Sequence, residues 1–123
     1  MKMKKSYAKR KHSNAAIRRM RVHKDFIKLL AIKPRAYKPI IASCNDDAVS
    51  CLCDIMYNVR LGSVPLPRAK LLKLKKYRHV LKKITSPRTS LPTRRRQLIQ
   101  HGGGLFSIVI PAVIGLISTL LSK

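Results

Sequence analysis

The stretch "SCNDDAVSCLCDIMYNVRLG", residues 43–62, decides the fold because it carries the clearest helix signals in the chain. Asn45 or Ser43 can cap the helix by accepting hydrogen bonds from its first backbone N–H groups, and two aspartates follow in the first turn, where the helix dipole favours negative charge. Gly62 suits the left-handed conformation with which many helices end. The stretch therefore predicts a helix that ends just before Gly62.

The apolar residues of this helix form one face, made of Val49, Leu52, Cys53, Met56 and Val59. No lysine or arginine occurs between residues 39 and 59, whereas both neighbouring parts of the chain are rich in them. This central segment is therefore the least charged material available for a core.

Two further apolar stripes at helical spacing predict helices over residues 14–32 and about 68–84. Ser90 can cap a last short helix that runs to about Gln100. No segment shows the alternation of a half-buried strand. We expect an all-α fold, a small helical domain of three main helices plus short ones.

The composition changes along the chain divide it into four expected parts. Residues 1–13 are lysine-rich with few aliphatic side chains and are expected to be a disordered basic arm. Residues 14–101 form the basic helical domain, and residues 102–104 a glycine hinge. Residues 105–123 form a hydrophobic C-terminal helix.

The charge is strongly positive and unevenly distributed. The 123 residues contain 28 Lys and Arg but only four acids, for a net charge of +24. Fourteen of the cations lie in residues 1–38 and thirteen in residues 60–96. A compact chain of this charge repels itself, so a polyanionic partner is expected, either nucleic acid or an anionic membrane.

No zinc-finger spacing or aromatic RNA-binding signature accompanies these cations, so we expect non-specific binding of a nucleic acid, with the choice between DNA and RNA left open. The expected contacts with phosphate are Lys9, Arg10, Lys11, Arg18, Arg19, Arg21, Lys73, Lys75, Lys76, Arg78, Lys82, Lys83, Arg94, Arg95 and Arg96.

The sequence offers little for catalysis or cofactor binding. It has no phosphate-binding loop and no nucleophile elbow, and two of its four acids are explained by the first turn of a helix. Cys51 and Cys53 point about 200° apart on a helix, so they are poorly placed to share a metal ion. We expect no enzyme activity, no cofactor and no metal site, with Cys44, Cys51 and Cys53 as reduced, buried thiols.

The segment from Leu105 to Leu121 contains no charged residue, and as a helix it would be about 26 Å long, near the lower limit for a membrane span. Insertion into a membrane, a buried core helix and self-association are the three alternatives. The apolar residues expected to enter a membrane are Leu105, Phe106, Ile108, Ile110, Val113, Ile114, Ile117 and Leu121.

Between about residue 24 and residue 121 the chain carries, in order, "CLCD", "GSVPL", "KLKKYRHVLKKI", "SLPTRRRQLIQHGGGL" and an apolar end. With this ordered set the chain resembles small basic proteins of adintoviruses and Polinton/Maverick elements, which have been likened to adenovirus core protein X, the precursor of mu. The resemblance implies a virion protein that condenses a double-stranded DNA genome. The expected location is the virion, and the host nucleus or cytoplasm during infection.

The resemblance also implies a processing site, because adenovirus-type proteases cut after Gly-Gly. The segment that is similar is Gln100, His101, Gly102, Gly103 and Gly104, with Gln100 where the family prefers an apolar residue. The alternative interpretation of the three glycines is a helix stop and hinge.

The sequence thus predicts a non-enzymatic viral core-type protein with a membrane-active or capsid-docking C-terminus. Two alternatives remain: a tail-anchored membrane protein whose basic domain binds lipid, and a capsid scaffold or cement protein. The expected partners are double-stranded DNA, a membrane or capsid proteins, and a second copy through the C-terminal segment.

Overall fold

The computed structural model describes residues 17–62, 64 and 66–121, and every regular element among them is a helix, which confirms the all-α prediction. The arm at residues 1–13, with Lys9, Arg10 and Lys11, lies outside the described residues. The elements are α2 (Ile17–Val22), α3 (Lys24–Ile32), η2 (Pro34–Ala36), α4 (Tyr37–Ser43), α5 (Asp46–Leu61), α6 (Arg68–Leu74), η3 (Lys75–Tyr77), α7 (Arg78–Thr85) and α8 (Leu91–Leu121).

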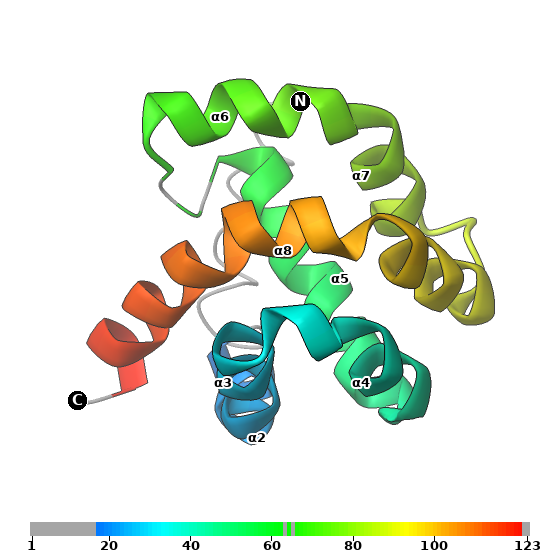
Figure 1. The fold of residues 1–123 in the computed structure, drawn as a ribbon, viewed down its shortest axis with the longest axis horizontal. Coiled ribbons are helices and arrows are strands. Elements are labelled where there is room, and N and C mark those ends of the chain that lie inside the picture. Colours follow the sequence, from blue (N-terminus) through cyan, green and yellow to red (C-terminus); the bar gives the residue numbers. More distant parts are fainter. Residues whose placement is uncertain (1–16, 63, 65, 122–123) are drawn as a thin grey trace.

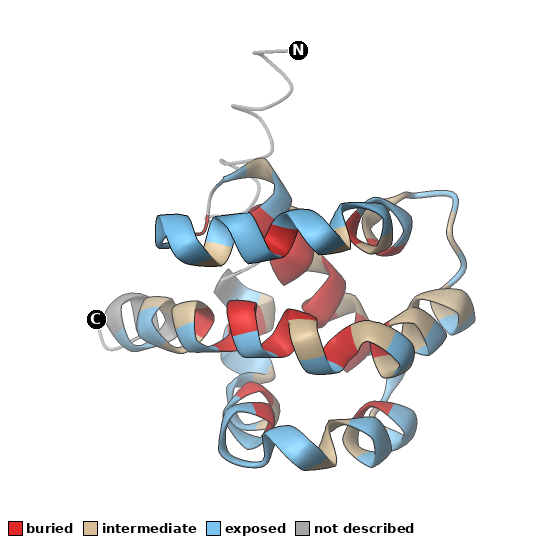
Figure 2. Cartoon of the chain, turned by 45° about the horizontal axis from the view of Figure 1, so that its top comes forward, coloured by how far each residue is buried: buried red, intermediate tan, exposed pale blue. Residues whose placement is uncertain are grey.

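The helices form three layers (Figure 1). α5 and α8 cross in the middle. On one side lies the α6–α7 layer, which consists of α6, η3 and α7, and on the other lies the α2–α4 layer, which consists of α2, α3, η2 and α4. Figure 2 shows buried residues concentrated on α5 and α8 and exposed residues dominating both outer layers. Most described cations of the two basic blocks thus lie in the outer layers, around a core built from the apolar residues of α5 and α8.

α5 begins and ends as its sequence predicts. The Asn45 side chain accepts a hydrogen bond from the Ala48 N–H at 2.8 Å, and Gly62 has a φ of 81°, in the left-handed region. The five residues of the predicted apolar face are all buried, and so are Ala48, Cys51, Ile55 and Asn58. The buried surface is wider than one face because both α7 and α8 pack against the helix.

The other two main helices are present but interrupted. The predicted helix at 14–32 is divided at His23 into α2 and α3, and its expected beginning at residues 14–16 lies outside the described residues. The helix at 68–84 becomes α6, η3 and α7, with one 3₁₀ turn in the middle. Pro39 lies in the first turn of the seven-residue α4, where its missing N–H breaks no intrahelical bond.

The predicted end of the last helix near Gln100 is wrong. Ser90 caps α8 as expected, accepting a 3.4 Å hydrogen bond from the Thr93 N–H, but the helix continues through the three glycines to Leu121. The glycines therefore neither stop a helix nor form a hinge in this structure. Their role is to let two tyrosine rings approach the backbone of α8.

Tyr37, from the start of α4, lies over Gly102 and Gly103. A Cβ atom at Gly102 would meet Cε2 of Tyr37 at 2.9 Å and Cε2 of Phe106 at 2.8 Å. The Tyr37 hydroxyl donates a 3.0 Å hydrogen bond to the Ile99 carbonyl, and its ring meets Phe106 edge-on, with centroids 5.7 Å apart. Only glycine leaves room for this contact between the α2–α4 layer and α8.

Tyr77 makes the equivalent contact from the other side. It belongs to η3, and a Cβ atom at Gly104 would overlap its hydroxyl and lie 2.5 Å from its Cζ. Each outer layer is therefore fastened to α8 by one tyrosine set against a glycine.

The beginning of the apolar segment is core in this structure. Leu105, Phe106, Ile108, Ile110 and Val113 are buried and Ile114 is half-buried, while the side chains of Ile117 and Leu121 lie outside the description. Within the described chain, residues 91–116 form a helix that is long and apolar enough to cross a membrane, by length and composition alone. In this fold 44% of its apolar stretch is buried inside the protein. Burial of these side chains stabilises the fold, by roughly 1.5–3 kcal/mol for each large one.

Candidate nucleic-acid interface

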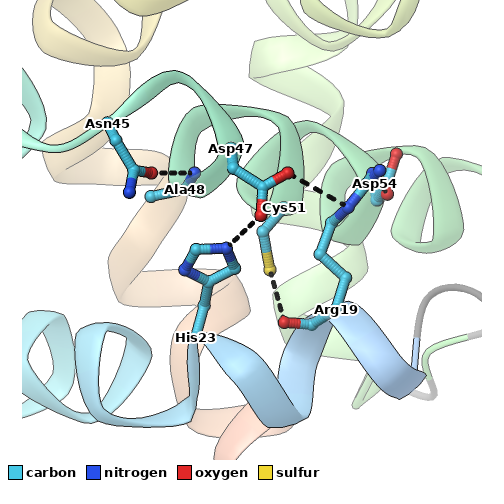
Figure 3. A network of polar contacts seen from close by, with 7 residues as sticks. All are labelled: Arg19, His23, Asn45, Asp47, Ala48, Cys51 and Asp54. Carbon is cyan, nitrogen blue, oxygen red and sulfur yellow. Dashed lines mark hydrogen bonds and ion pairs between the residues drawn. The ribbon is translucent and has the colours of Figure 1, made fainter.

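Two acids of α5 bind residues of the α2–α4 layer (Figure 3). Arg19 forms an ion pair with Asp54 and, at 3.9 Å, a longer one with Asp47. The His23 ring lies 2.7 Å from the other oxygen of Asp47. This hydrogen bond lowers the pKa of Asp47, and the nearby charges of His23 and Arg19 act in the same direction. Arg19, predicted as a contact with phosphate, is thus already engaged inside the protein.

Arg95 has a second internal role. Its Nη1 donates to the carbonyl oxygens of Ile41 and Cys44, both at 2.7 Å, and its Nη2 reaches Asp46 at 2.7 Å. These bonds go to carbonyl groups at the C-terminal end of α4, where the helix itself supplies no N–H partner. Arg95 therefore fixes α4 to α8.

The arginines on either side of Arg95 differ from each other. Arg94 is half-buried, and its Nη2 donates a 2.6 Å hydrogen bond to the Ser86 carbonyl, tying α8 to the end of α7. Arg96 is exposed. Of the three adjacent arginines, Arg96 is the one whose side chain points to solvent.

The α6–α7 layer keeps its cations at the surface. Every one of its predicted contacts with phosphate is exposed: Lys73, Lys75, Lys76, Arg78, Lys82 and Lys83. No acid follows Asp54 anywhere in the sequence, so this layer contains no carboxylate of its own. On the opposite side, Arg18 and Arg21 of α2 are also exposed.

Two basic residues at this layer, Arg60 and His79, were not among the predicted contacts. Arg60 ends α5 and His79 lies on α7, and with Arg78, Leu81 and Lys82 they line a pocket of about 330 Å³. Arg60 is the one basic residue of α5, and its place in the last turn, two positions before Gly62, indicates an exposed helix end. Its proximity to α7 depends on the tertiary fold, which sequence periodicity does not reveal.

The residues of the expected processing site lie within α8. Gln100 and Gly103 are exposed, Gly102 is buried, and His101 and Gly104 are half-buried. Their backbone is helical and covered in part by the two tyrosines. A protease that reads an extended chain could not bind this segment until the helix opened locally.

The cysteines are unreactive by environment. Burial raises the pKa of Cys51 to about 12 and that of Cys53 to about 11, although Arg19 and Arg94, respectively, act in the opposite direction. Burial also raises the pKa of Cys44. Since the thiolate is the reactive form, these side chains act as small hydrophobic groups at neutral pH. In the part of the chain described, no three His, Cys, Asp or Glu side chains gather as a metal site would need.

Comparison with models of known families, with curated proteins and with solved structures finds no match for this chain.

Proposed function

We propose that this chain is a non-enzymatic protein that binds double-stranded DNA without sequence preference and condenses it in a virion. The observation that carries the proposal concerns the α6–α7 layer. Its six lysines and arginines predicted to contact phosphate are all exposed, and the layer contains no carboxylate. Ion pairing inside the protein occupies cations of α2 and α8 instead. The exposed cations are thus those left for an external polyanion.

The physical basis is the release of counterions. Each phosphate that a lysine or arginine neutralises frees condensed cations, and log K falls by roughly 0.9 per unit of log salt for each contact on duplex DNA. Exposed lysines on helices suit this binding because they are point charges on flexible stems and need no particular base sequence. The resemblance to proteins of adenovirus-like elements is the reason for proposing a viral genome as the DNA.

A matched pair of quadruple variants tests the proposal on the full chain. One replaces Lys73, Lys75, Lys76 and Lys83 of the α6–α7 layer by glutamine. The other replaces Lys24, Lys28, Lys33 and Lys38 of the α2–α4 layer, which are also exposed. Binding to a 30-base-pair duplex is measured over a range of salt concentrations, and folding by circular dichroism.

The first variant is expected to lower the slope of log K against log salt by roughly 3 to 4, and the second by clearly less. Equal effects of the two variants would move the interface to the whole surface. Weak binding by the unaltered chain near 150 mM salt would remove the proposed function.

A second candidate is binding to an anionic membrane surface, as expected for a lipid-binding basic domain. It is favoured by Leu71 and Leu72, which are 45% and 54% exposed on α6 among lysines. Apolar side chains beside cations are typical of helices that lie on anionic lipid. Replacing both leucines by serine would weaken sedimentation with phosphatidylglycerol vesicles while leaving DNA binding unchanged. Vesicle binding that is unaffected by this change would count against the candidate.

The fold constrains any membrane activity of the C-terminal segment. Leu105 to Val113 pack against α5 and the outer layers, so they cannot enter lipid while the core is closed. Insertion therefore requires α8 to leave the core. DNA binding by the folded domain and membrane insertion would occur at different times.

A further inference from the structure

We infer that the pocket between the end of α5 and α7 is a seat for one phosphate group of the DNA backbone. This inference rests on the proposed function and deepens it, because it separates one built contact from the many exposed lysines. The pocket has a volume of about 330 Å³ and is lined by Arg60, Arg78, His79, Leu81 and Lys82. Three permanent cations and an imidazole thus surround one hollow, with no carboxylate in its lining.

Arg60 is oriented toward the pocket by a short chain of hydrogen bonds. Its Nη1 donates to the Thr85 hydroxyl at 3.2 Å, and that hydroxyl donates to the Leu81 carbonyl at 2.6 Å. Because the bond to Thr85 uses one of the five N–H donors of a guanidinium, it fixes the planar group while leaving it donors for a ligand. A guanidinium held in place loses less conformational freedom when it binds an oxyanion.

The cations come from two elements that are brought together by packing. Arg60 ends α5, while Arg78 and Lys82 are four residues apart on α7 and therefore share one of its faces. Their like charges repel one another across the pocket, and a doubly coordinated anion relieves this repulsion. Two guanidinium groups with planar donor forks favour phosphate oxygens over a simple halide ion.

The chemistry is shared by free phosphate and by the diester of a nucleic acid, and the DNA backbone is favoured because three of the lining residues, Arg78, His79 and Lys82, belong to the α6–α7 layer, whose predicted phosphate contacts are all exposed. A diester seated there would bring the neighbouring phosphates of the same strand toward these lysines. The pocket would then fix where the DNA backbone lies on the layer, whereas the exposed lysines alone attract it without fixing its position.

The experiment uses the full chain and three single variants. Arg60→Gln removes the charge and the fork, Arg60→Lys keeps the charge but loses the fork, and Arg88→Gln is the control at an exposed arginine outside the pocket. Affinity for a 30-base-pair duplex is measured at 150 mM salt, and folding is checked by circular dichroism. Arg60→Gln is expected to weaken binding by about tenfold or more, Arg60→Lys by less, and Arg88→Gln by under about threefold.

A second measurement does not depend on DNA. Inorganic phosphate is titrated against chloride at constant ionic strength while the ring signals of His79 are followed by NMR. Saturable shifts that Arg60→Gln abolishes and Arg88→Gln preserves are the expected result. Shifts without saturation would overturn the pocket as a phosphate site.

The two measurements separate the inference from the proposed function. Equal DNA affinity of Arg60→Gln and Arg88→Gln, or unchanged affinity of Arg60→Lys, would overturn the seat and leave DNA binding by the α6–α7 layer intact. Saturable phosphate binding with no effect of Arg60→Gln on DNA affinity would assign the pocket to free phosphate and overturn its role on DNA. Failure of the unaltered chain to bind DNA would remove the proposed function and with it the seat for a DNA phosphate, and saturable phosphate binding in that case would leave a pocket for free phosphate only.

Discussion

The two outer layers of the molecule have similar charge but are attached differently. Both are rich in lysine and arginine, and each is fastened to α8 by a tyrosine over a glycine. The α2–α4 layer is also joined to the core by ion pairs, through Arg19 to Asp54 and His23 to Asp47. In the α6–α7 layer, which contains no acid, the predicted phosphate contacts stay exposed.

The difference shows that the residues packed around a cation, and not the composition of its segment, decide whether it bonds within the protein or stays exposed. Arg95 and Arg96 are adjacent in sequence, yet Arg95 donates hydrogen bonds to carbonyl groups at the end of α4 and Arg96 is exposed to solvent. The changes below test the attachments of the two layers, from the largest expected effect to the smallest.

The largest effect is expected from Gly104→Ala, which breaks the attachment of the α6–α7 layer. The new methyl group would overlap the Tyr77 hydroxyl, so η3 has to move away from α8. Overpacking of this kind destabilises by about 1–3 kcal/mol, and the gain of roughly 1 kcal/mol in helix propensity offsets only part of it. Urea unfolding followed by circular dichroism measures the net loss.

Two further variants control this prediction. Gly115→Ala places a methyl group where nothing lies within 4 Å, so stability should stay equal or increase. Adding Tyr77→Phe to Gly104→Ala removes the overlapping hydroxyl and should recover part of the loss. Full stability of Gly104→Ala alone would contradict the attachment.

The next effect concerns the α2–α4 layer. Arg95→Met removes the donor to the Ile41 and Cys44 carbonyls and leaves Asp46 without its ion pair. Carbonyl groups left without a partner destabilise by about 1–3 kcal/mol. Arg96→Met, at an exposed position, should leave the thermal midpoint unchanged. Equal thermal midpoints of the two variants would show that Arg95 does not hold α4 to α8.

A smaller effect is expected at alkaline pH, from the thiols of α5 that lie between the layers. The pKa of Cys51 is raised to about 12 and that of Cys53 to about 11, from 9.0. Raised values mean that their contribution to stability is complete below pH 9 and is lost as the pH rises toward 11–12. The unaltered chain should therefore lose stability relative to Cys51→Ala/Cys53→Ala between pH 8 and pH 10.5.

Alkylation by iodoacetamide gives an independent reading of the same burial. At pH 8 the native chain should react far more slowly than the chain in urea. Equal rates in the two conditions would show that the thiols are accessible, and a pH-independent difference between the two chains would rule out their titration.

The smallest effect is expected from the hydrogen bond between His23 and Asp47, an exposed residue of α5. The pKa of Asp47 is lowered by its hydrogen bond with His23, so its contribution is present above pH 3.8 and is lost as the pH falls through the lowered value. Asp47→Asn should lower the thermal midpoint slightly at pH 6 and not at all near pH 2. Asp25→Asn, which removes an exposed acid of α3, is the control. A large fall of the thermal midpoint of Asp47→Asn at pH 6 would mean that the bond between Asp47 and His23 is a main attachment of the α2–α4 layer.

Local signals were sufficient for much of this fold. The caps of α5, the all-α class and the N-terminus of α8 depend on residues within a few positions of one another, which is the range over which capping and periodicity act. The burial of Leu105 to Val113 was one of three alternatives for the apolar segment. The sequence does not choose between these alternatives, because a core helix and a membrane helix have the same composition.

The candidate site was harder to predict. Exposed lysines on α6 and α7 follow from the helical spacing, but the loss of Arg19 and Arg95 to internal bonds depends on contacts with distant parts of the chain. The pocket at Arg60 has the same origin. The three glycines were misinterpreted because a tyrosine that needs close approach to a backbone leaves no local mark on the glycine's own segment.

The triple glycine also has a consequence for kinetics. Three glycines make the middle of α8 intrinsically the weakest part of its length, and two tyrosines from distant segments hold it closed. Amide hydrogens on either side of this point are expected to exchange in two separate groups, with opening of the middle governed by the departure of Tyr37 or Tyr77. A ligand that draws either outer layer away from α8 would therefore raise the opening rate there, and the lifetime of the unbroken helix would become a measure of what is bound outside.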